Sequence, residues 1–362
     1  MNDKIIKKRI NAIKLRLKKK KIDCLIVTRP ANVTFTTGFS GGDSWAVIAP
    51  RRLYLLTDSR YAEQAQKECP SCRIIERSAP IAQAAAKLIK RLKSAHSVAV
   101  EKSASLAVFG ELKKNLKTRL KTVDNIIEAV RSSKDESEIA AIKKAAQIAA
   151  KALKETLPII KQGITENELA GRLDLQIRRL GAINSFETIV AFGPNASRPH
   201  HQTGDKKLKK NDTILIDFGA RYKNYCSDLT RCFVTGRPGA FYKKVYDAVE
   251  QAQAAAIKMV RAGAEIKKVD AAARQVITKH DLPVYGHGTG HGLGLEVHEE
   301  PVVAAKGKGK LKAGQIITIE PGVYMPGKLG VRIENDVLVT ETGCKILSSD
   351  CPHQPLLRSA KR

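Results

Sequence analysis

The sequence from position 286 reads Gly286-His287-Gly288-Thr289-Gly290-His291-Gly292-Leu293-Gly294-Leu295-Glu296-Val297-His298-Glu299. Glycine stands at every even position from 286 to 294, and each glycine in a helix interior costs about 1 kcal/mol relative to alanine. We therefore expect an extended chain here. In an extended chain His287 and His291 share one face about 13 Å apart, so both cannot bind one metal ion. The segment predicts one metal ligand and one histidine that faces a substrate, with bare glycine backbone between them.

Two aspartates lie in apolar runs upstream of this segment. Asp217 stands in Thr213-Ile214-Leu215-Ile216-Asp217-Phe218-Gly219, and Asp228 stands in Cys226-Ser227-Asp228-Leu229-Thr230-Arg231. A hairpin that turns at Tyr222-Lys223 would set the two carboxylates opposite each other, with Cβ atoms about 5 Å apart. Like charges at that distance destabilise a sheet, and their burial costs more. A cation between them removes the conflict.

The same arrangement recurs downstream. Glu320 ends the apolar run Ile316-Ile317-Thr318-Ile319-Glu320, and Glu334 ends Gly330-Val331-Arg332-Ile333-Glu334, with a turn expected around Pro326-Gly327-Lys328. Taken alone, Asp217 could also be a carboxylate that accepts hydrogen bonds within its hairpin, and Glu334 could form an ion pair with Arg332. Four inward carboxylates and one histidine together predict a site for two divalent metal ions that activate a bridging water as hydroxide. Such oxygen-rich ligation favours manganese or cobalt, with iron or zinc as alternatives.

The chain divides by pattern near Glu128. Before it, strands alternate with helices, which indicates an α/β domain; we expect helices over 6–17, 79–93 and 104–120 and strands over 24–27, 45–48, 53–56 and 98–100. After it, helices pack on antiparallel hairpins, which indicates an α+β domain; we expect helices from the capping box Ser133-Lys134-Asp135-Glu136, from Thr165, over 241–260 and over 266–279, and strands over 213–219, 225–234, 315–320 and 331–340.

Composition limits the class of protein. No run approaches the ~20 apolar residues of a membrane span, and no apolar region follows the basic N-terminus as in a secretory signal.

The seven cysteines are odd in number and scattered, which predicts reduced thiols and a cytoplasmic protein. Cys69 and Cys72 have redox or zinc spacing, but no second pair accompanies them. The net charge of +28 is densest before residue 128. Aromatic residues make up only 5%, so a solvated basic surface is favoured over nucleic-acid binding.

These motifs resemble the aminopeptidase P and prolidase family of pita-bread metallopeptidases. The resemblance rests on Asp217, Asp228, the run from His287 to His298, Glu320-Pro321-Gly322, Arg332-Ile333-Glu334, and the segment Thr188–Ala196 that leads to Pro199-His200. The N-terminal half resembles the creatinase-type domain at Asn32, Thr37–Gly41 and Leu56–Ala65. The resemblance implies a creatinase-like α/β domain over 1–127 and an α+β pita-bread catalytic domain over 128–362.

The resemblance also implies five metal ligands, namely Asp217, Asp228, His291, Glu320 and Glu334. In that scheme Asp228 and Glu334 bridge both ions, Asp217 holds one, and His291 with Glu320 holds the other.

Four further residues are implied to take part in catalysis. His200, His287 and His298 would contact the scissile carbonyl and the leaving nitrogen, and Arg332 would orient a carboxylate or the substrate. Two positions depart from the usual family pattern, namely His201 and Asn335.

The function that follows is a metal-dependent exopeptidase that cleaves the bond before proline, either as an Xaa-Pro aminopeptidase or as an Xaa-Pro dipeptidase. Proline-containing peptides or dipeptides are the expected partners, and a homodimer is implied by the family. Three alternatives stay open: another pita-bread enzyme such as methionine aminopeptidase, a metal-free creatinase-like hydrolase, and a non-catalytic binding protein whose basic N-terminal face holds nucleic acid.

Overall fold

The computed structural model of the chain describes residues 3–92, 95–116, 118–353 and 356–357. The chain forms two compact units, Met1–Arg131 and Ser132–Arg362. The sequence placed the division before Glu128, whereas helix α6 (Glu128–Arg131) belongs to unit 1. Hydrogen bonds hold it there: Asn32 Nδ2 donates to Glu128 Oε1 (2.7 Å), and Arg131 Nη1 donates to Asn32 Oδ1 (2.5 Å).

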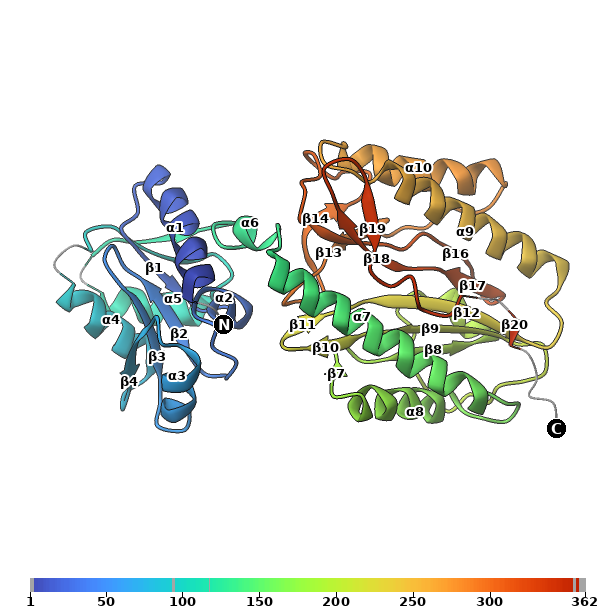
Figure 1. The fold of residues 1–362 in the computed structure, drawn as a ribbon, viewed down its shortest axis with the longest axis horizontal. Helices are drawn as coiled ribbons and strands as arrows, with labels where there is room; N and C mark the ends of the chain where they lie inside the picture. The colour runs from blue at the N-terminus through green and yellow to red at the C-terminus, as the bar shows by residue number, and fades with distance from the viewer. Residues whose placement is uncertain (1–2, 93–94, 117, 354–355, 358–362) are drawn as a thin grey trace. The chain divides into compact units, whose positions relative to one another are not determined.

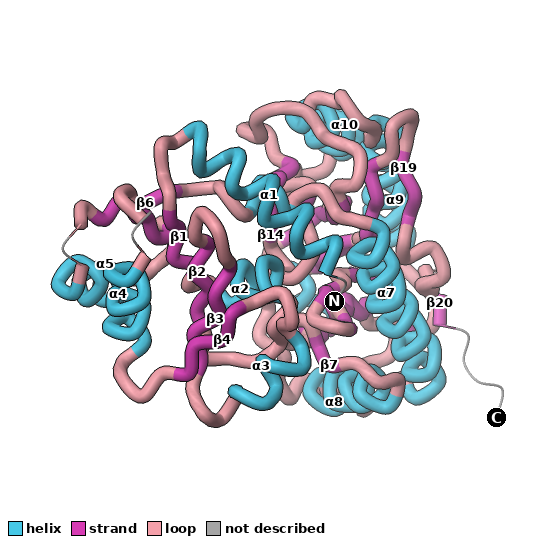
Figure 2. The backbone as a smooth tube through the Cα atoms, turned by 60° about the vertical axis from the view of Figure 1, so that its left-hand side comes forward, coloured by secondary structure: helices cyan, strands magenta, loops and turns pink. Residues whose placement is uncertain are grey.

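Unit 1 is an α/β domain built on one mixed sheet. Its other elements are α1 (Asp3–Lys19), β1 (Cys24–Val27), α2 (Pro30–Thr37), β2 (Trp45–Ile48), β3 (Leu53–Thr57), α3 (Ala62–Glu68), β4 (Arg73–Glu76), α4 (Ile81–Arg91), β5 (Val98–Glu101), α5 (Leu106–Asn115) and β6 (Leu120–Val123). The strand order is β4-β3-β2-β1-β5-β6. Helices α4 and α5 cover one face of the sheet, and α1 and α2 lie over the other (Figures 1 and 2).

The predicted elements of unit 1 are present except at the end of its last long helix. The helix predicted over 104–120 is too long at its C-terminal end, because α5 ends at Asn115 and β6, which begins at Leu120, pairs in parallel with β5. Backbone pairing of this edge strand with β5 outweighs the helical spacing of the local apolar residues.

Unit 2 is an α+β domain with its helices on the outside. Its elements are α7 (Glu136–Thr156), η1 (Leu157–Ile159), α8 (Glu166–Arg179), β7 (Ile183–Asn184), β8 (Ile189–Phe192), η2 (Gly193–Ser197), β9 (Thr213–Phe218), β10 (Ala220–Tyr222), β11 (Tyr225–Cys226), β12 (Leu229–Thr235), α9 (Ala240–Met259), α10 (Ile266–Lys279), β13 (Gly290–Gly292), β14 (Glu299–Val303), β15 (Ile316–Ile319), β16 (Gly322–Met325), β17 (Leu329–Arg332), β18 (Asn335–Val339), β19 (Cys344–Ile346) and β20 (Leu356–Leu357). Figure 1 shows α7 and α8 on one side of the sheets and α9 and α10 on the other.

The side chains on the two faces of β9 pack into two different hydrophobic cores of unit 2. Ile214, Ile216 and Phe218 pack into the core beneath α7 and α8, and Leu215 packs into the core beneath α9 and α10. Successive side chains of a strand point to opposite faces. Asp217 therefore points to the same side as Leu215, into the space between the sheets.

The start of α7 differs from the prediction by two residues. Asp135 is the N-cap, its side chain accepts from the backbone N–H groups of Ser137 and Glu138, and Glu138 accepts from the Asp135 N–H in return. Ser133 does not take part because it forms a β-bridge with Gln315. The capping box is real, but Asp135 rather than Ser133 opens it.

Two expectations from composition have structural counterparts. Within the described ranges, no helix combines the length and the apolar content that a membrane crossing requires. All seven cysteines are free thiols. Cys69 and Cys72 are hydrogen-bonded to each other, and no third metal-binding side chain joins them within the part of the chain that the structure describes.

Candidate metal centre

Residues 286–299 form the extended, glycine-rich connection that the sequence predicts, and β13 lies within it. A Cβ atom on Gly290 would lie 1.9 Å from a backbone oxygen of β15, and one on Gly292 would lie 2.2 Å from a backbone oxygen of β14. Only glycine fits at these positions, because β13 runs between the two strands with its backbone against theirs. His291, between the two glycines, is thereby held beside β15.

The first pair of carboxylates lies on the hairpin that includes β9 and β12. Thr230 pairs with Asp217, and the chain turns at Lys223 and Asn224, which both have positive φ (48° and 70°). The prediction that Asp217 and Asp228 stand directly opposite each other, about a turn at residues 222–223, is therefore wrong: the turn lies one residue further along, and Thr230, two residues beyond Asp228, stands opposite Asp217. A two-residue turn with two positive φ angles matches the twist of a hairpin and fixes this register. The two aspartates are instead diagonal neighbours on one face.

The second pair lies on the ribbon that runs from β15 to β18. Glu320 follows β15 and Glu334 precedes β18, and the strand register is the same on both sides of them. The two glutamates therefore face each other across the ribbon, with the turn at 326–328, as the sequence predicts.

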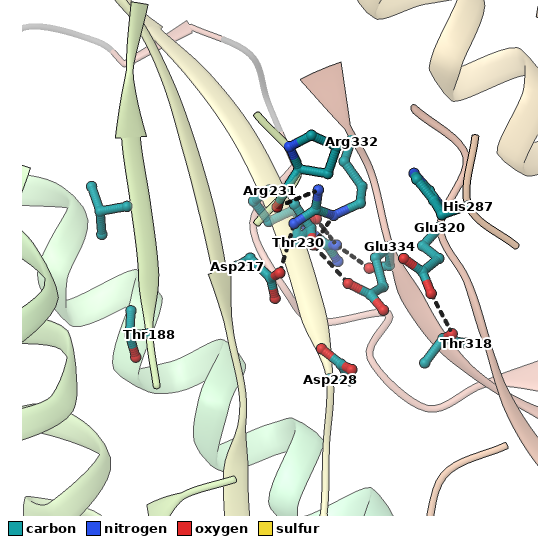
Figure 3. Close-up of polar contacts among 12 residues, drawn as sticks. Thr188, Asp217, Asp228, Thr230, Arg231, His287, Thr318, Glu320, Arg332 and Glu334 are labelled. Carbon is teal, nitrogen blue, oxygen red and sulfur yellow. Dashed lines mark hydrogen bonds and ion pairs between the residues drawn. The ribbon is translucent and has the colours of Figure 1, made fainter. Parts of the chain in front are cut away.

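Four of the five predicted ligand groups, Asp228, His291, Glu320 and Glu334, meet in one place, and Figure 3 shows the three carboxylates among them. The ligand atoms of Asp228, His291 and Glu334 all lie within 4.8 Å of one another, the only such group of three among the described residues. His291 Nε2 also lies 3.4 Å from Glu320 Oε1 and 3.6 Å from Asp228 Oδ2. His291 Nδ1 donates to the carbonyl of Gly292 (3.0 Å), so the lone pair on Nε2 faces the carboxylates.

Asp217, the fifth group, joins the cluster through Arg332. Arg332 Nη2 donates to Asp217 Oδ2 at 2.6 Å, whereas Asp217 Oδ1 is buried without a hydrogen-bond partner among the described residues. Burial and then repulsion between the carboxylates raise the pKa of Asp228 and of Glu334 well above the usual value. A buried acceptor without a donor costs free energy, and so do crowded carboxylates. The residues present therefore fit divalent cations, which would satisfy both.

Arg332 is buried and connects the cluster to two further side chains. Its Nε donates to Thr230 Oγ1 (3.0 Å), and Thr230 donates to Glu334 Oε2 (2.6 Å). Its Nη1 donates to the hydroxyl of Tyr324 (2.9 Å). The carboxylate that Arg332 orients in this structure is that of Asp217.

The histidines predicted to contact substrate lie around this cluster. His287 is half-buried; its Nδ1 donates to the carbonyl of Gly288 (2.7 Å), and its Nε2 lies 3.0 Å from the Tyr324 hydroxyl. Burial lowers the pKa of His287 and raises that of Tyr324 to about 12, so at neutral pH the tyrosine donates to a neutral imidazole. The ring of His298 meets that of His291 edge to face at 4.5 Å between centroids. His200 is exposed and close enough to His298 to lower its pKa, although burial is the larger cause.

Glu166, fully buried at the start of α8, holds the loop that carries His200. Its Oε1 accepts from the N–H of Phe192 and from Asn195 Nδ2, both at 2.8 Å. Its Oε2 lies 2.8 Å from His201 Nε2. His201, a departure from the family pattern, is therefore an anchor of this loop and points away from solvent.

Arg274 on α10 holds the loop that carries His287. Its guanidinium donates to the carbonyls of Tyr285 (2.8 Å) and His287 (2.6 Å), and its Nε donates to Asp270 (2.7 Å). Asp270 also accepts from Thr289 (2.7 Å). The ion pair of Arg274 and Asp270 thus holds the segment from Tyr285 to Thr289 at three points beside the cluster.

Sequence reasoning missed these supporting residues. Thr230 carried a signal, because it lies two residues from Asp228 on the strand predicted over 225–234 and therefore on the same face. Glu166 and Arg274 carried none, since their contacts join elements that are distant in the sequence.

Comparison with known proteins agrees with this geometry. Residues 140–341 match the model of metallopeptidase family M24, and residues 9–133 match the creatinase/prolidase N-terminal domain. An uncharacterized peptidase of Bacillus subtilis, YqhT, is 35% identical over 330 residues, which cover 90% of this chain and 94% of that protein.

Solved structures resemble the chain over nearly its whole length. An Xaa-Pro dipeptidase from Bacillus anthracis has a TM-score of 0.94 at 32% identity, covering 97% of this chain and 99% of that one. An X-Pro aminopeptidase from Thermotoga maritima has a TM-score of 0.87 at 35% identity, covering 94% and 99%. The predicted fold class is confirmed, and the chain belongs to metallopeptidase family M24, with a creatinase/prolidase-type N-terminal domain.

Proposed function

We propose that this metallopeptidase is an exopeptidase that hydrolyses the bond before proline, either as an Xaa-Pro dipeptidase or as an Xaa-Pro aminopeptidase. The observation that carries the proposal is the meeting of two buried carboxylates, Asp228 and Glu334, with the half-buried Glu320 and His291 in one space, and with Asp217 tied to them by Arg332. Similarity to both an Xaa-Pro dipeptidase and an X-Pro aminopeptidase over nearly the full chain supports the substrate class.

In this proposal two divalent ions are held by the five side chains Asp217, Asp228, His291, Glu320 and Glu334. Four carboxylates and one imidazole form an oxygen-rich donor set, which favours manganese or cobalt, with zinc or iron as alternatives. Bound ions of this kind polarise a carbonyl oxygen and lower the pKa of a water molecule.

The surrounding residues keep the donors in position. Arg332 fixes the plane of the Asp217 carboxylate and neutralises part of the local negative charge. Thr230 donates to Glu334, and Thr318 donates to Glu320 (3.2 Å). Each hydroxyl orients its carboxylate, and the Glu320 oxygen that accepts from Thr318 is also the one that lies 3.4 Å from His291 Nε2.

Proton delivery falls to the histidines around the cluster. The nitrogen of proline carries no N–H in the peptide and must gain a proton when the bond breaks. His298 and His200 are exposed on the side of the cluster that solvent reaches, so either can hand a proton to that nitrogen. His287 has Nδ1 on the Gly288 carbonyl and Nε2 on the Tyr324 hydroxyl, so it has no free nitrogen to carry the proton, and a contact with the substrate carbonyl would require it to release Tyr324.

Two rival functions are less well supported. Methionine aminopeptidases resemble only the catalytic half, whereas this chain also matches the creatinase/prolidase N-terminal domain. A binding protein without hydrolytic activity has no need for a buried cluster of carboxylates, which destabilises the fold unless cations occupy it.

The test uses protein loaded with manganese or cobalt, with two bound ions per chain verified by elemental analysis. An Xaa-Pro dipeptide and an Xaa-Pro-Yaa tripeptide are offered beside matched peptides in which alanine replaces proline and a peptide with N-terminal methionine. We expect proline-dependent release of the first residue, and the preferred length separates dipeptidase from aminopeptidase. Absence of proline-dependent release from the loaded enzyme contradicts the proposal, and preference for the methionine peptide favours the rival enzyme.

Assembly as a homodimer and a cytoplasmic location belong to the same proposal. Light scattering of the purified protein at several concentrations tests the first, and fractionation of the source cells tests the second.

A further inference from the structure

Gln253, a buried residue of α9, reaches the backbone next to two of the proposed ligands. Its exposed fraction is 6%. Its Nε2 donates to the carbonyl of Ile319 at 3.0 Å and to the carbonyl of Ile333 at 2.8 Å. The residues that follow these two carbonyls in the chain are Glu320 and Glu334. A single amide group therefore joins the two strands at the peptide units that carry both glutamates.

The ribbon needs such a connection at this point because it passes from one sheet to another. Strands β15 and β18 belong to the five-stranded sheet, and β16 and β17 form a separate two-stranded sheet. The last regular pair of the first sheet is Ile319 with Asn335, and the first pair of the second is Gly322 with Arg332. Pro321 stands between them and has no N–H for a ladder hydrogen bond. The separation of the two strands at Glu320 and Glu334 is thus set by side chains as well as by the ladder.

Asn335 fixes which way the Gln253 amide points. The Oδ1 of Asn335 accepts from Arg231 Nη2 and from Ser348 Oγ, both at 2.9 Å. Its Nδ2 is consequently the atom that faces Gln253 and donates to Gln253 Oε1 at 3.2 Å. With its oxygen held by Asn335, Gln253 presents its two N–H groups to the two carbonyls, which matches the two donors of an amide.

We propose that Gln253, oriented by Asn335, is a positioning residue that sets the distance between Glu320 and Glu334 and thereby the affinity of the metal centre. This inference rests on the proposed function, because it requires that the two glutamates bind metal. Gln253 does not approach the substrate; it acts through the peptide units that precede the ligands. Removal of side chains that orient metal ligands weakens metal binding roughly 10- to 100-fold.

The experiment compares Gln253→Leu with the matched control Gln251→Leu, which lies on the same helix but is exposed and contacts only His280 in the structure as described. Asn335→Asp is a second variant, because it keeps acceptors for Arg231 and Ser348 but turns a carboxylate oxygen toward Gln253 Oε1. Metal-free proteins are titrated with Mn²⁺ by calorimetry, and melting temperatures are measured with and without Mn²⁺.

We expect roughly 10- to 100-fold weaker Mn²⁺ binding for Gln253→Leu and for Asn335→Asp, no change for Gln251→Leu, and a smaller rise of melting temperature on adding Mn²⁺ to the first two. The double variant is expected to lose less than the sum of the single losses, because both residues act in one contact. Unchanged Mn²⁺ affinity in both variants, with equal loss of stability in the metal-free and the loaded protein, shows a purely structural role and overturns the inference. If the parent protein itself fails to bind Mn²⁺, the proposed function fails first.

Discussion

Arg332 Nη2 lies 2.6 Å from Asp217 Oδ2, and this contact ties a buried cation to a proposed ligand that lies outside the group formed by Asp228, His291 and Glu334. The guanidinium occupies one oxygen of Asp217 and leaves the other buried without a hydrogen-bond partner among the described residues. Arg332 also reaches Thr230 and Tyr324, so a single side chain connects ligands on two hairpins to the residue that holds His287.

Replacement of Arg332 by methionine is expected to remove this connection while keeping most of the side-chain volume. Loss of one partner of a buried ion pair lowers the free energy of unfolding by about 3 to 5 kcal/mol, and we expect kcat to fall at least about tenfold, because Asp217 loses its orientation. Chemical denaturation and steady-state kinetics with an Xaa-Pro peptide measure the two effects. A variant with parental kcat and parental metal content would show that the contact is incidental.

His291 and His298 stack edge to face, but we expect different losses from them. His291→Ala is expected to lose metal, because Nε2 faces the carboxylates, and elemental analysis after dialysis measures this. His298→Ala is expected to keep its metal and to lose roughly 10²- to 10⁴-fold in kcat, as for a residue that transfers a proton. If His298→Ala loses as much metal as His291→Ala, the division into a metal ligand (His291) and a proton-transferring residue (His298) is wrong.

The metal-free protein is expected to become less stable as pH rises above the ordinary carboxyl range of about 4. Burial holds the pKa of Asp228, Glu334 and Asp336 above their usual values. The folded chain therefore binds more protons than the unfolded chain above the ordinary carboxyl range, and the free energy of unfolding falls as pH passes through the raised pKa values.

Bound metal is expected to cancel this dependence, since it compensates the ionised carboxylates. Denaturation midpoints in EDTA and in excess Mn²⁺, measured at matched pH, isolate the effect, because the contribution of the other charges is common to both. If the denaturation midpoint in EDTA and the midpoint in Mn²⁺ differ by the same amount at every pH, the prediction is wrong.

Glu166→Gln is expected to loosen the loop that carries His200. Glutamine keeps one oxygen that can accept a hydrogen bond, but its NH₂ group would face an N–H of Phe192, Asn195 or His201. One buried N–H group is then left without an acceptor, which costs about 1 to 3 kcal/mol. We expect a lower melting temperature and a higher KM with metal content retained. Glu168→Gln, on the exposed face of the same helix, is the control and should match the parent.

The sequence was most informative where side-chain spacing alone decides geometry. Alternation along β9 placed Asp217 on the inner face, and the glycines on both sides of His291 excluded a helix. The register of the first hairpin was wrong because it depends on the backbone angles of Lys223 and Asn224, and lysine seldom adopts positive φ. Contacts such as those of Gln253 and Glu166 were beyond reach, since they join segments that meet only after the whole unit has folded.

The proposed ligands are spread along the chain from Asp217 to Glu334, and the last two stand on the ribbon that crosses between sheets. A chain still on the ribosome that has not yet extended past this ribbon holds an incomplete set of donors, whatever its earlier part has folded into. The donor set, and with it the capacity for peptide hydrolysis, would thus be complete only after the chain has extended past Glu334.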